Sequence, residues 1–302
     1  MPANKDNNND ISGKTIIITG ANSGIGYEAA LNFSCRGANV GLVCRSRERG
    51  EQALNKIKKL SGSQNLNLFI ADFSQVKQIP KLAQQINTRY PSIDVLCNNA
   101  GSVQRQHIIT DEGFEWTMAV NHLSGFALSK WLMPNLKRAA AQSQARIVFT
   151  SSVAHKRAAI DFDNLNLVGN YSILNAYGKS KLMNVLTARQ MQKVVGKDNI
   201  VVSSFHPGVV STGIWKYGGA IVGFLGVLAK PFVLNAKQGA ETLVWLATSN
   251  DEASSNANGN YFFECKRAET GDFVSDNSAE QMWQQSLTLL KNYLPAKETE
   301  IA

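Results

Sequence analysis

Two residues in the stretch "AYGKSK", Tyr177 and Lys181, have the types and the spacing for acid–base chemistry. Residues four apart on a helix lie on one face, so the phenol and the ammonium would be neighbours. A positive charge beside a phenol favours the phenolate, so we expect Lys181 to lower the pKa of Tyr177 from about 10 toward the working pH, as a general acid–base needs. Because such a pair also occurs by chance in many helices, it does not establish catalysis alone.

The stretch "TGANSGIG", residues 19–26, places three glycines between the apolar "KTIII" and the helix-like "YEAALNFSCRG". Glycines permit a tight turn and a close approach of the backbone to a ligand, and a helix N-terminus offers unpaired N–H groups to a phosphate. An ordinary strand-to-helix turn is the alternative. The surrounding elements have to decide between the two.

Apolar, β-branched runs alternate with segments of helical periodicity. The expected strands are 14–20, 39–45, 66–72, 94–98, 146–151, 200–206 and 261–264, and the helical stretches between them include 48–60, 78–89, 114–138 and 177–195. Repeated strand–helix–strand units imply parallel strands with helices on both faces. We therefore predict an α/β fold: a single-domain, Rossmann-type, doubly wound parallel sheet of about seven strands. In that fold the glycine-rich turn follows the first strand, where a dinucleotide diphosphate binds.

The composition fits one globular domain, because 44% of the 302 residues are hydrophobic and 18% are charged. The net charge of +8 comes without a dense basic run, so we expect no nucleic-acid partner. Four widely spaced cysteines predict buried free thiols, no metal site and a reducing compartment. The polar start lacks a signal-peptide core, so we expect a cytoplasmic protein. The expected organisation is a disordered tail at 1–10, the domain at 11–292 and a second tail at 293–302.

Six blocks in a fixed order resemble the motifs of the short-chain dehydrogenase/reductase family, and the resemblance covers residues 12–290. They are "TGANSGIG", the strand-end aspartate of "ADF" (Asp72), "NNAG" (98–101), the asparagine of "AVNHLSG" (Asn121), the serine of "VFTSSVAH" (Ser152) and "YGKSK" (Tyr177, Lys181). A further stretch, "HPGVVST", follows at 206–212, where the family has a Pro-Gly turn and a threonine near the nicotinamide.

The resemblance implies a role for each matching residue. Tyr177 would be the general acid–base, Lys181 would assist it and bind the nicotinamide ribose, and Ser152 would hydrogen-bond the substrate oxygen. Asn121 would hold the water of a proton relay to Lys181, and these four residues are the expected catalytic set. The family also places the cofactor against a longer set. The expected cofactor-binding residues are Gly20, Asn22, Ser23, Gly24, Ile25, Gly26, Arg45, Ser46, Asp72, Phe73, Asn99, Ala100, Gly101, Tyr177, Lys181, Pro207, Gly208, Val210 and Thr212.

The choice of cofactor depends on the end of the second expected strand, "LVCRSRERG". An acidic residue there would bind the adenosine ribose of NAD and repel a 2′-phosphate, but the first carboxylate is that of Glu48. A guanidinium binds a phosphate bidentately, so Arg45, with Ser46 as a second contact, predicts NADP(H). Arg47 and Arg49 are expected on a solvated helix face.

Within the family, "VCRSRERGEQA", "NHLSGF", "SSVAH" and "AYGKSKLMNVL" look most like the retinol dehydrogenase-like branch. The resemblance implies an NADP(H)-dependent oxidoreductase that transfers a hydride between nicotinamide and a hydrophobic carbonyl compound or alcohol, whether retinal-, aldehyde- or ketone-like. Two alternatives stay open: a non-catalytic NADPH-binding interaction protein, and a double-bond reductase like the protochlorophyllide reductases. A homodimer also stays open.

The apolar segment 213–236 follows the Pro-Gly turn and is expected to cover the substrate as a lid. Its uninterrupted apolar run is about a dozen residues, too short to span a bilayer. Its outer face could therefore contact a membrane only peripherally. A buried core helix is the alternative interpretation.

Overall fold

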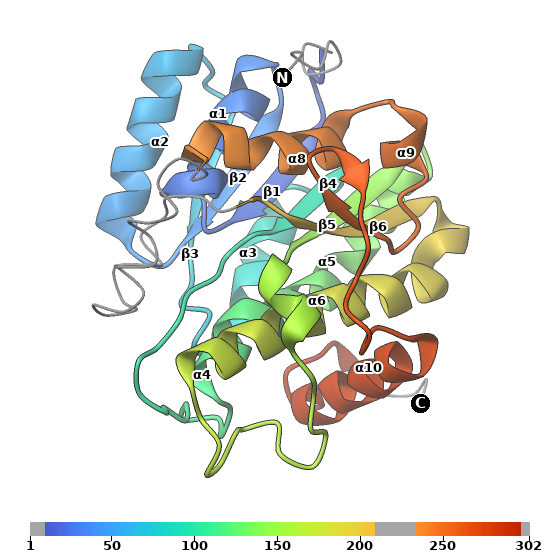
Figure 1. The fold of residues 1–302 in the computed structure, drawn as a ribbon. Helices are drawn as coiled ribbons and strands as arrows, with labels where there is room; N and C mark the ends of the chain where they lie inside the picture. Colours follow the sequence, from blue (N-terminus) through green and yellow to red (C-terminus); the bar gives the residue numbers. More distant parts are fainter. Residues whose placement is uncertain (1–9, 209–233, 297–302) are drawn as a thin grey trace.

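The computed structural model describes residues 10–208 and 234–296, and its centre is one sheet of eight strands (Figure 1). The strand order is β3-β2-β1-β4-β5-β6-β7-β8, and the first seven strands are parallel. The predicted single-domain, doubly wound parallel sheet is therefore confirmed. The strands are β1 (Thr15–Thr19), β2 (Asn39–Cys44), β3 (Leu66–Ile70), β4 (Val95–Asn98), β5 (Ala145–Thr150), β6 (Ile200–His206), β7 (Tyr261–Phe263) and β8 (Lys266–Arg267).

Strand β8 is an addition to the sequence prediction. Its two exposed residues, Lys266 and Arg267, pair antiparallel with Phe263 and Phe262 of β7. The two-residue turn between the strands has a positive φ at both of its residues, 49° and 57°, which suits a tight hairpin. Two charged residues carry no apolar periodicity, so the sequence gives no sign of this strand.

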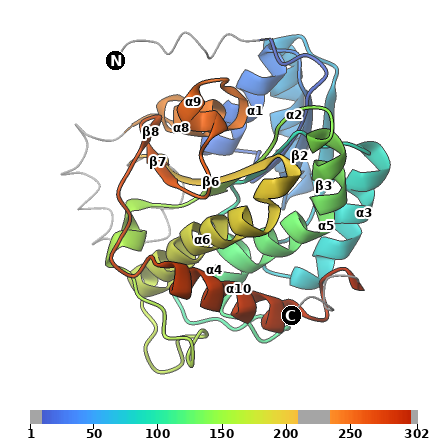
Figure 2. The same ribbon diagram turned by 90° about the vertical axis from the view of Figure 1, so that its right-hand side faces the viewer.

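Helices cover both faces of the sheet, as the two ribbon views show (Figures 1 and 2). One face carries α1 (Gly24–Cys35), α2 (Arg47–Ser61) and α8 (Ala236–Thr248); the other carries α3 (Ile79–Arg89), α5 (Ser124–Ala140), α6 (Ile173–Val195) and α10 (Asp276–Leu290). Along β1, the side chains of Ile16 and Ile18 pack on the face that α1, α2 and α8 cover. The side chain of Ile17 packs on the opposite face. Both faces of the strand are buried, which is why its run is apolar without alternation.

The stretch expected as one helix over 114–138 contains a local change of pitch. It begins with α4 (Trp116–Met118), passes through a π-helical turn at Ala119–Leu123 and continues as α5. The buried carboxylate of Glu115 starts the stretch, because its oxygens accept the backbone N–H groups of Thr117 and Met118, each at 2.7 Å. Single π-turns inside α-helices are frequent at functional sites, and this one contains Asn121.

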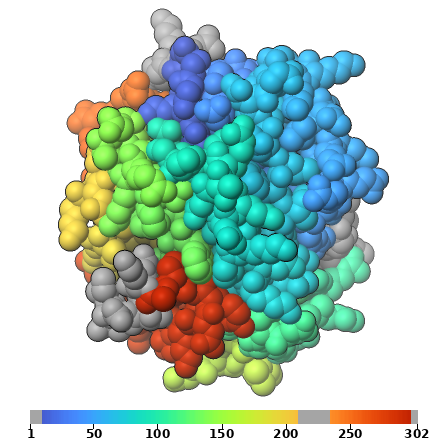
Figure 3. All heavy atoms as spheres, turned by 180° about the vertical axis from the view of Figure 1, so that it is seen from behind, coloured from blue at the N-terminus to red at the C-terminus, as the bar shows by residue number. Residues whose placement is uncertain are grey.

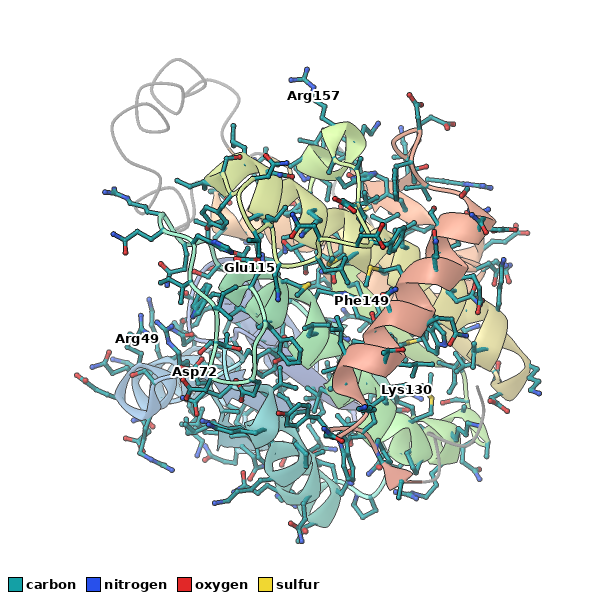
Figure 4. The ribbon with its side chains drawn as sticks, turned by 90° about the horizontal axis from the view of Figure 1, so that it is seen from below. Arg49, Asp72, Glu115, Lys130, Phe149 and Arg157 are labelled. Carbon is teal, nitrogen blue, oxygen red and sulfur yellow. The ribbon has the colours of Figure 1, made fainter. Side chains whose placement is uncertain are left out.

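The C-terminal helix α10 packs across α5 and α6. The ring of Trp283 lies edge-on to Phe126 at 4.9 Å, and the ammonium of Lys130 lies 5.0 Å from the Trp283 ring centre (Figure 4). Packing continues past the expected domain end, because Leu294 is buried and the indole of Trp131 donates to the carbonyl of Tyr293. From behind, the C-terminal segment lies against segments from the middle of the chain (Figure 3). The first two residues of the expected tail at 293–302 therefore pack against the domain.

A short helix, α9 (Glu252–Ser255), precedes β7 and is capped by the Asp251 side chain. The expectation that the cysteines are buried needs correction. The described cysteines are all free, but only Cys44 and Cys97 are buried. Cys35 is exposed because it ends α1 on the solvent side, and Cys265 is partly exposed in the β7–β8 turn.

Candidate active site

The expected site residues gather at one edge of the sheet, where the parallel strands β1, β4, β5 and β6 end. The glycine-rich loop follows β1, the segment Asn99–Gly101 follows β4, Ser152 follows β5 and Pro207 follows β6. Tyr177 and Lys181 come to the same edge on α6. In an open α/β sheet this is the edge at which ligands bind.

The glycine-rich loop packs directly against the segment after β4. A Cβ atom on Gly26 would lie 2.4 Å from the carbonyl oxygen of Gly20 and 2.7 Å from the Asn99 side-chain nitrogen, so only glycine fits. Gly20 has a φ of +70°, which also requires glycine. The two segments are tied by Thr19, whose hydroxyl oxygen accepts the backbone N–H groups of Asn99 and Ala100, both at 2.9 Å. Sequence analysis missed Thr19; its signal is a threonine directly before the first glycine.

The N-terminus of α1 is open to a ligand. Ser23, the N-cap residue, is exposed and its side chain makes no capping hydrogen bond, while Asn22 is partly buried and Ile25 is buried. Unpaired N–H groups and the positive end of a helix dipole suit a phosphate. This donor set fits the diphosphate of a dinucleotide.

The ends of β2 and β3 form the neighbouring part of the edge, because Cys44 pairs with Ile70. Arg45 is exposed and pairs with no described residue. The Ser46 hydroxyl oxygen caps α2 by accepting the N–H of Arg49, so its own proton remains available to a ligand. Arg49 and Asp72 lie on the same side of the molecule (Figure 4).

Asp72 is held with one carboxylate oxygen free. Its Oδ1 accepts from the backbone N–H and from the hydroxyl of Ser74, both at 2.9 Å, and its Oδ2 bonds no described residue. A free carboxylate oxygen suits the exocyclic amine of an adenine. The next residue, Phe73, is buried, and its carbonyl accepts from the hydroxyl of Ser124.

Tyr177 and Lys181 lie together, but not in the way that their spacing suggests. The ammonium nitrogen of Lys181 is 5.6 Å from the centre of the Tyr177 ring and donates to the carbonyl of Thr150 at 3.1 Å. Burial raises the pKa of Tyr177, and its interaction with the Ser152 side chain opposes that shift only partly. Burial also lowers the pKa of Lys181 to about 8.

The expectation that Lys181 lowers the pKa of Tyr177 is therefore wrong in this arrangement. Desolvation of the phenol is the largest cause of the upward shift, and Lys181 is itself desolvated and donates to a backbone carbonyl. At neutral pH the phenol is protonated, so it is ready to donate a proton rather than to accept one.

The hydroxyl groups of Ser151 and Ser152 have different hydrogen-bond partners. The hydroxyl of Ser151 donates to the carbonyl of Lys181 at 2.8 Å and so fixes the end of β5 to α6. The hydroxyl of Ser152 accepts the N–H of Ala154 at 3.3 Å and keeps its own proton for another acceptor. Ser152, rather than Ser151, is therefore available for the predicted contact with a substrate oxygen.

Both polar atoms of the Asn121 side chain have protein partners. Its Oδ1 accepts the N–H of Ser102 at 2.7 Å, and its Nδ2 donates to the hydroxyl of Ser180 at 2.9 Å. A Cβ atom on Gly101 would lie 3.1 Å from the Lys181 nitrogen and 3.4 Å from Asn121 Oδ1, so the segment after β4 closes on both residues. A relay water at Asn121 remains a prediction.

Asn184 is a second asparagine that sequence analysis missed. Its Nδ2 donates to the carbonyl of Asn121 at 3.0 Å and to that of Thr150 at 3.1 Å. Its signal is its spacing: it stands seven residues after Tyr177 and three after Lys181, on the same face of α6.

The turn after β6 is described only in part. Gly208 has a φ of +85°, which glycine alone adopts easily, and Pro207 precedes it. Val210 and Thr212 lie outside the described residues, as does segment 209–233, which includes most of the expected lid. Before the turn, the ring nitrogen Nδ1 of His206 is buried with no partner among the described residues.

None of the helices in ranges 10–208 and 234–296 is both long and apolar enough to cross a membrane. In the same ranges, no cluster of three or more His, Cys, Asp or Glu residues could hold a metal ion.

Comparison with known proteins gives one consistent family. The family model for short chain dehydrogenases matches residues 14–220. Human retinol dehydrogenase 12 is 35% identical over 284 residues, which cover 94% of this chain and 88% of that protein. L-sorbose reductase from Gluconobacter frateurii, solved with NADPH and L-sorbose, has a TM-score of 0.68 at 22% identity and covers 89% of this chain and 99% of its own. The 3-ketoacyl-(acyl-carrier-protein) reductase from Brucella melitensis, solved with NADH, has a TM-score of 0.66 at 21% identity, with coverage of 83% and 96%.

Proposed function

The chain belongs to the short-chain dehydrogenase family, and on that basis we propose that it is an NADP(H)-dependent oxidoreductase that interconverts a hydrophobic carbonyl compound and its alcohol. The expected resemblance to the retinol dehydrogenase-like branch is confirmed by the identity over most of the chain. The chain is thus an oxidoreductase; its cofactor, its substrate and the roles of its residues are the proposal.

The observation that carries the proposal is that Tyr177 lies beside Ser152 and Lys181 at the carboxyl edge of the sheet. A carbonyl oxygen that gains negative charge needs a hydrogen-bond donor and then a proton. The Ser152 hydroxyl would supply the first and the Tyr177 phenol the second. In the oxidative direction the same phenolate would accept the proton of the alcohol.

The bound nicotinamide would supply or accept the hydride. The protein holds and orients that group at the sheet edge. The open N-terminus of α1 would hold the diphosphate, the free oxygen of Asp72 would meet the adenine, and Lys181 would reach the nicotinamide ribose. The segment Asn99–Gly101 would form the floor beneath the cofactor, because it lies between the glycine-rich loop and Lys181.

The preference for NADP(H) rests on the end of β2. Arg45 there is exposed and unpaired among the described residues, whereas Arg47 is bonded to Glu51 at 3.4 Å. A free guanidinium at this place would bind the 2′-phosphate of NADP(H). The fold alone does not select the cofactor, since structures with this fold have been solved with NADPH and with NADH.

The hydrophobic substrate class rests on kinship with human retinol dehydrogenase 12 and on the apolar sequence of 213–236. We propose this segment as the substrate lid and as the part that would touch a membrane surface, although most of it lies outside the described residues. The proposed substrates are retinal-like compounds, long-chain aldehydes and ketones.

A direct assay separates this function from its alternatives. The purified protein would be mixed with NADPH or NADH and a panel of retinal, straight-chain aldehydes, ketones and conjugated alkenes, with cofactor oxidation followed by absorbance. We expect turnover of apolar carbonyl compounds with NADPH. Tight NADPH binding without turnover of any compound would instead indicate an interaction protein, and turnover of alkenes alone would indicate a double-bond reductase.

A further inference from the structure

Three buried polar side chains lie directly behind the catalytic residues. His122, Asn184 and Ser286 come from the π-turn, from α6 and from α10, and each is at most 1% exposed. The ring nitrogen Nδ1 of His122 is 3.2 Å from Asn184 Oδ1, and its Nε2 is 3.0 Å from the Ser286 hydroxyl oxygen. No step of the proposed reaction uses them.

The direction of the hydrogen bonds follows from Asn184. Its Nδ2 has two protons, and both are donated, one to the carbonyl of Asn121 and one to the carbonyl of Thr150. Its Oδ1 therefore faces His122 and can only accept. It follows that Nδ1 of His122 carries a proton and donates it to Asn184.

The protonation state of the other ring nitrogen, Nε2, follows from this. Burial lowers the pKa of His122 to about 4, so the ring is neutral near pH 7 and carries its single proton on Nδ1. Nε2 is an acceptor, and the Ser286 hydroxyl is its donor. That hydroxyl also lies 2.8 Å from the carbonyl of Met282, but its one proton can serve only one acceptor at a time.

The hydrogen-bond chain from His122 through Asn184 ends at an acceptor to which Lys181 also donates. The carbonyl of Thr150 accepts from both Asn184 and the Lys181 ammonium, each at 3.1 Å. The carbonyl of Asn121, which Asn184 also holds, belongs to the residue that anchors Ser102 and Ser180 around the site. A shift of Asn184 would thus move both carbonyls and free Lys181 from its position.

We propose that His122 and Asn184 are positioning residues, which hold the carbonyls of Asn121 and Thr150 so that Lys181 stays beside Tyr177, and that Ser286 ties this arrangement to the C-terminal helix. The effect on turnover rests on the proposed function, whereas the hydrogen-bond chain and its effect on Lys181 do not. A purely structural role is the competing explanation, because a fully bonded buried network also makes a core rigid.

The first experiment tests the hydrogen-bond chain without any substrate. The whole sequence has four histidines, so NMR of protein with ¹⁵N-labelled histidine gives four ring patterns, and the spectrum of His122→Asn identifies that of His122. We expect the Nδ1–H form of His122, unchanged from about pH 5.5 to 8. A ring protonated on Nε2 alone, or one that titrates near its ordinary pKa, would overturn the inference.

The second experiment follows Lys181 itself. In protein with ¹³C-labelled lysine, with Lys181→Met used for assignment, Asn184→Leu should lower the pKa of Lys181 further. The reason is that the Thr150 carbonyl would leave its position, so the buried ammonium would lose the hydrogen bond that stabilises its charge. Thr187→Val is the matched control, because Thr187 is equally buried one turn further along α6 and its hydroxyl has no described partner. An unchanged pKa in Asn184→Leu, or an equal shift in the control, contradicts the positioning role.

Turnover gives the third readout. We expect Asn184→Leu to lower kcat by about tenfold to hundredfold, as small displacements in an active site do, with the control variant little changed. His122→Asn keeps a donor nitrogen near the position of Nδ1 and should retain more of kcat than His122→Leu. Equal losses in the two His122 variants would mean that the donor does not matter. If the wild-type protein turned over no substrate, the proposed function would fail, and the two NMR experiments would still decide this inference.

Discussion

The ammonium of Lys181 donates a hydrogen bond of 3.1 Å to the carbonyl oxygen of Thr150. This bond joins the helix that carries Tyr177 to the end of strand β5, next to Ser152. Because burial lowers the pKa of Lys181 from 10.5 to about 8, the lysine loses its charge within the pH range of an ordinary assay.

We therefore expect kcat/KM for carbonyl reduction to fall as the pH rises above about 8. The charged form of Lys181 is lost there, while the phenol of Tyr177 stays protonated to a higher pH because burial raises its pKa. A profile measured between about pH 6 and 10 checks this expectation. Lys181→Met should be slow and should lack the limb near pH 8; a limb that survives in this variant belongs to another group.

Arg45→Asp should reverse the cofactor preference toward NAD(H). A carboxylate in place of the guanidinium would repel the 2′-phosphate, and losing one charged hydrogen-bonding partner should weaken NADPH binding by about tenfold to hundredfold. Fluorescence titration with NADPH and NADH measures the ratio of affinities. Arg47→Asp is the control, since Arg47 is exposed and bonded to Glu51. If the ratio of NADPH to NADH affinity were unchanged in Arg45→Asp but changed in Arg47→Asp, the contact with the 2′-phosphate would be assigned to Arg47.

Gly26→Ala should abolish dinucleotide binding. Its Cβ would lie 2.4 Å from the carbonyl of Gly20, so the glycine-rich loop would have to move away from Asn99. Calorimetric titration with NADPH measures the loss. Gly62→Ala serves for comparison, because a Cβ there meets no atom within 4 Å, although its φ of +72° costs stability. Gly62→Ala should unfold at a lower temperature than the wild type and bind NADPH normally. Normal NADPH binding by Gly26→Ala would show that the glycine-rich loop is not part of the cofactor site.

Stability should decrease as the pH falls from about 6.5 to 4, partly because of His206. Burial, together with the nearby charges of His155 and Lys156, lowers the pKa of His206 to about 4. Between about pH 6.5 and 4 the unfolded chain therefore binds a proton at this histidine that the folded chain does not bind. For a shift of this size the loss approaches about 3 kcal/mol by pH 4. Urea unfolding of the wild type and of His206→Leu at several pH values isolates this contribution. Parallel pH dependences would assign the loss to other groups, including His122.

The fold could be predicted because its signals are local and strong. The strand "TIIIT" is buried on both faces, and the spacing of glycines after it fixes where the first helix begins. Strand β8 could not be predicted, since its pairing depends on the two positive φ angles of Glu264 and Cys265, which the residue types do not favour. The periodicity of apolar residues does not predict the π-turn at Asn121 either, because it indicates only a continuous helix.

The structure brings the predicted site residues together, but their electrostatics could not be predicted from the sequence. The motif positions of Ser152, Tyr177 and Lys181 follow from the sequence, and the structure brings them to one edge of the sheet. The direction of the pKa shift of Tyr177 was predicted wrongly, because spacing along a helix says nothing about how far the phenol is desolvated. Asn184 was missed because its partners are backbone carbonyls of segments distant in sequence.

The central claim is that Tyr177 is the proton donor of a carbonyl reductase that uses NADPH. The most direct test compares NADPH-dependent reduction of a long-chain aldehyde by the wild type and by Tyr177→Phe, together with NADPH affinity and thermal stability of both. We predict that the variant folds and binds NADPH as the wild type does, and that its kcat is lower by about 10²–10⁴-fold, as loss of a general acid requires. A variant that reduces the aldehyde at close to the wild-type rate would contradict the claim.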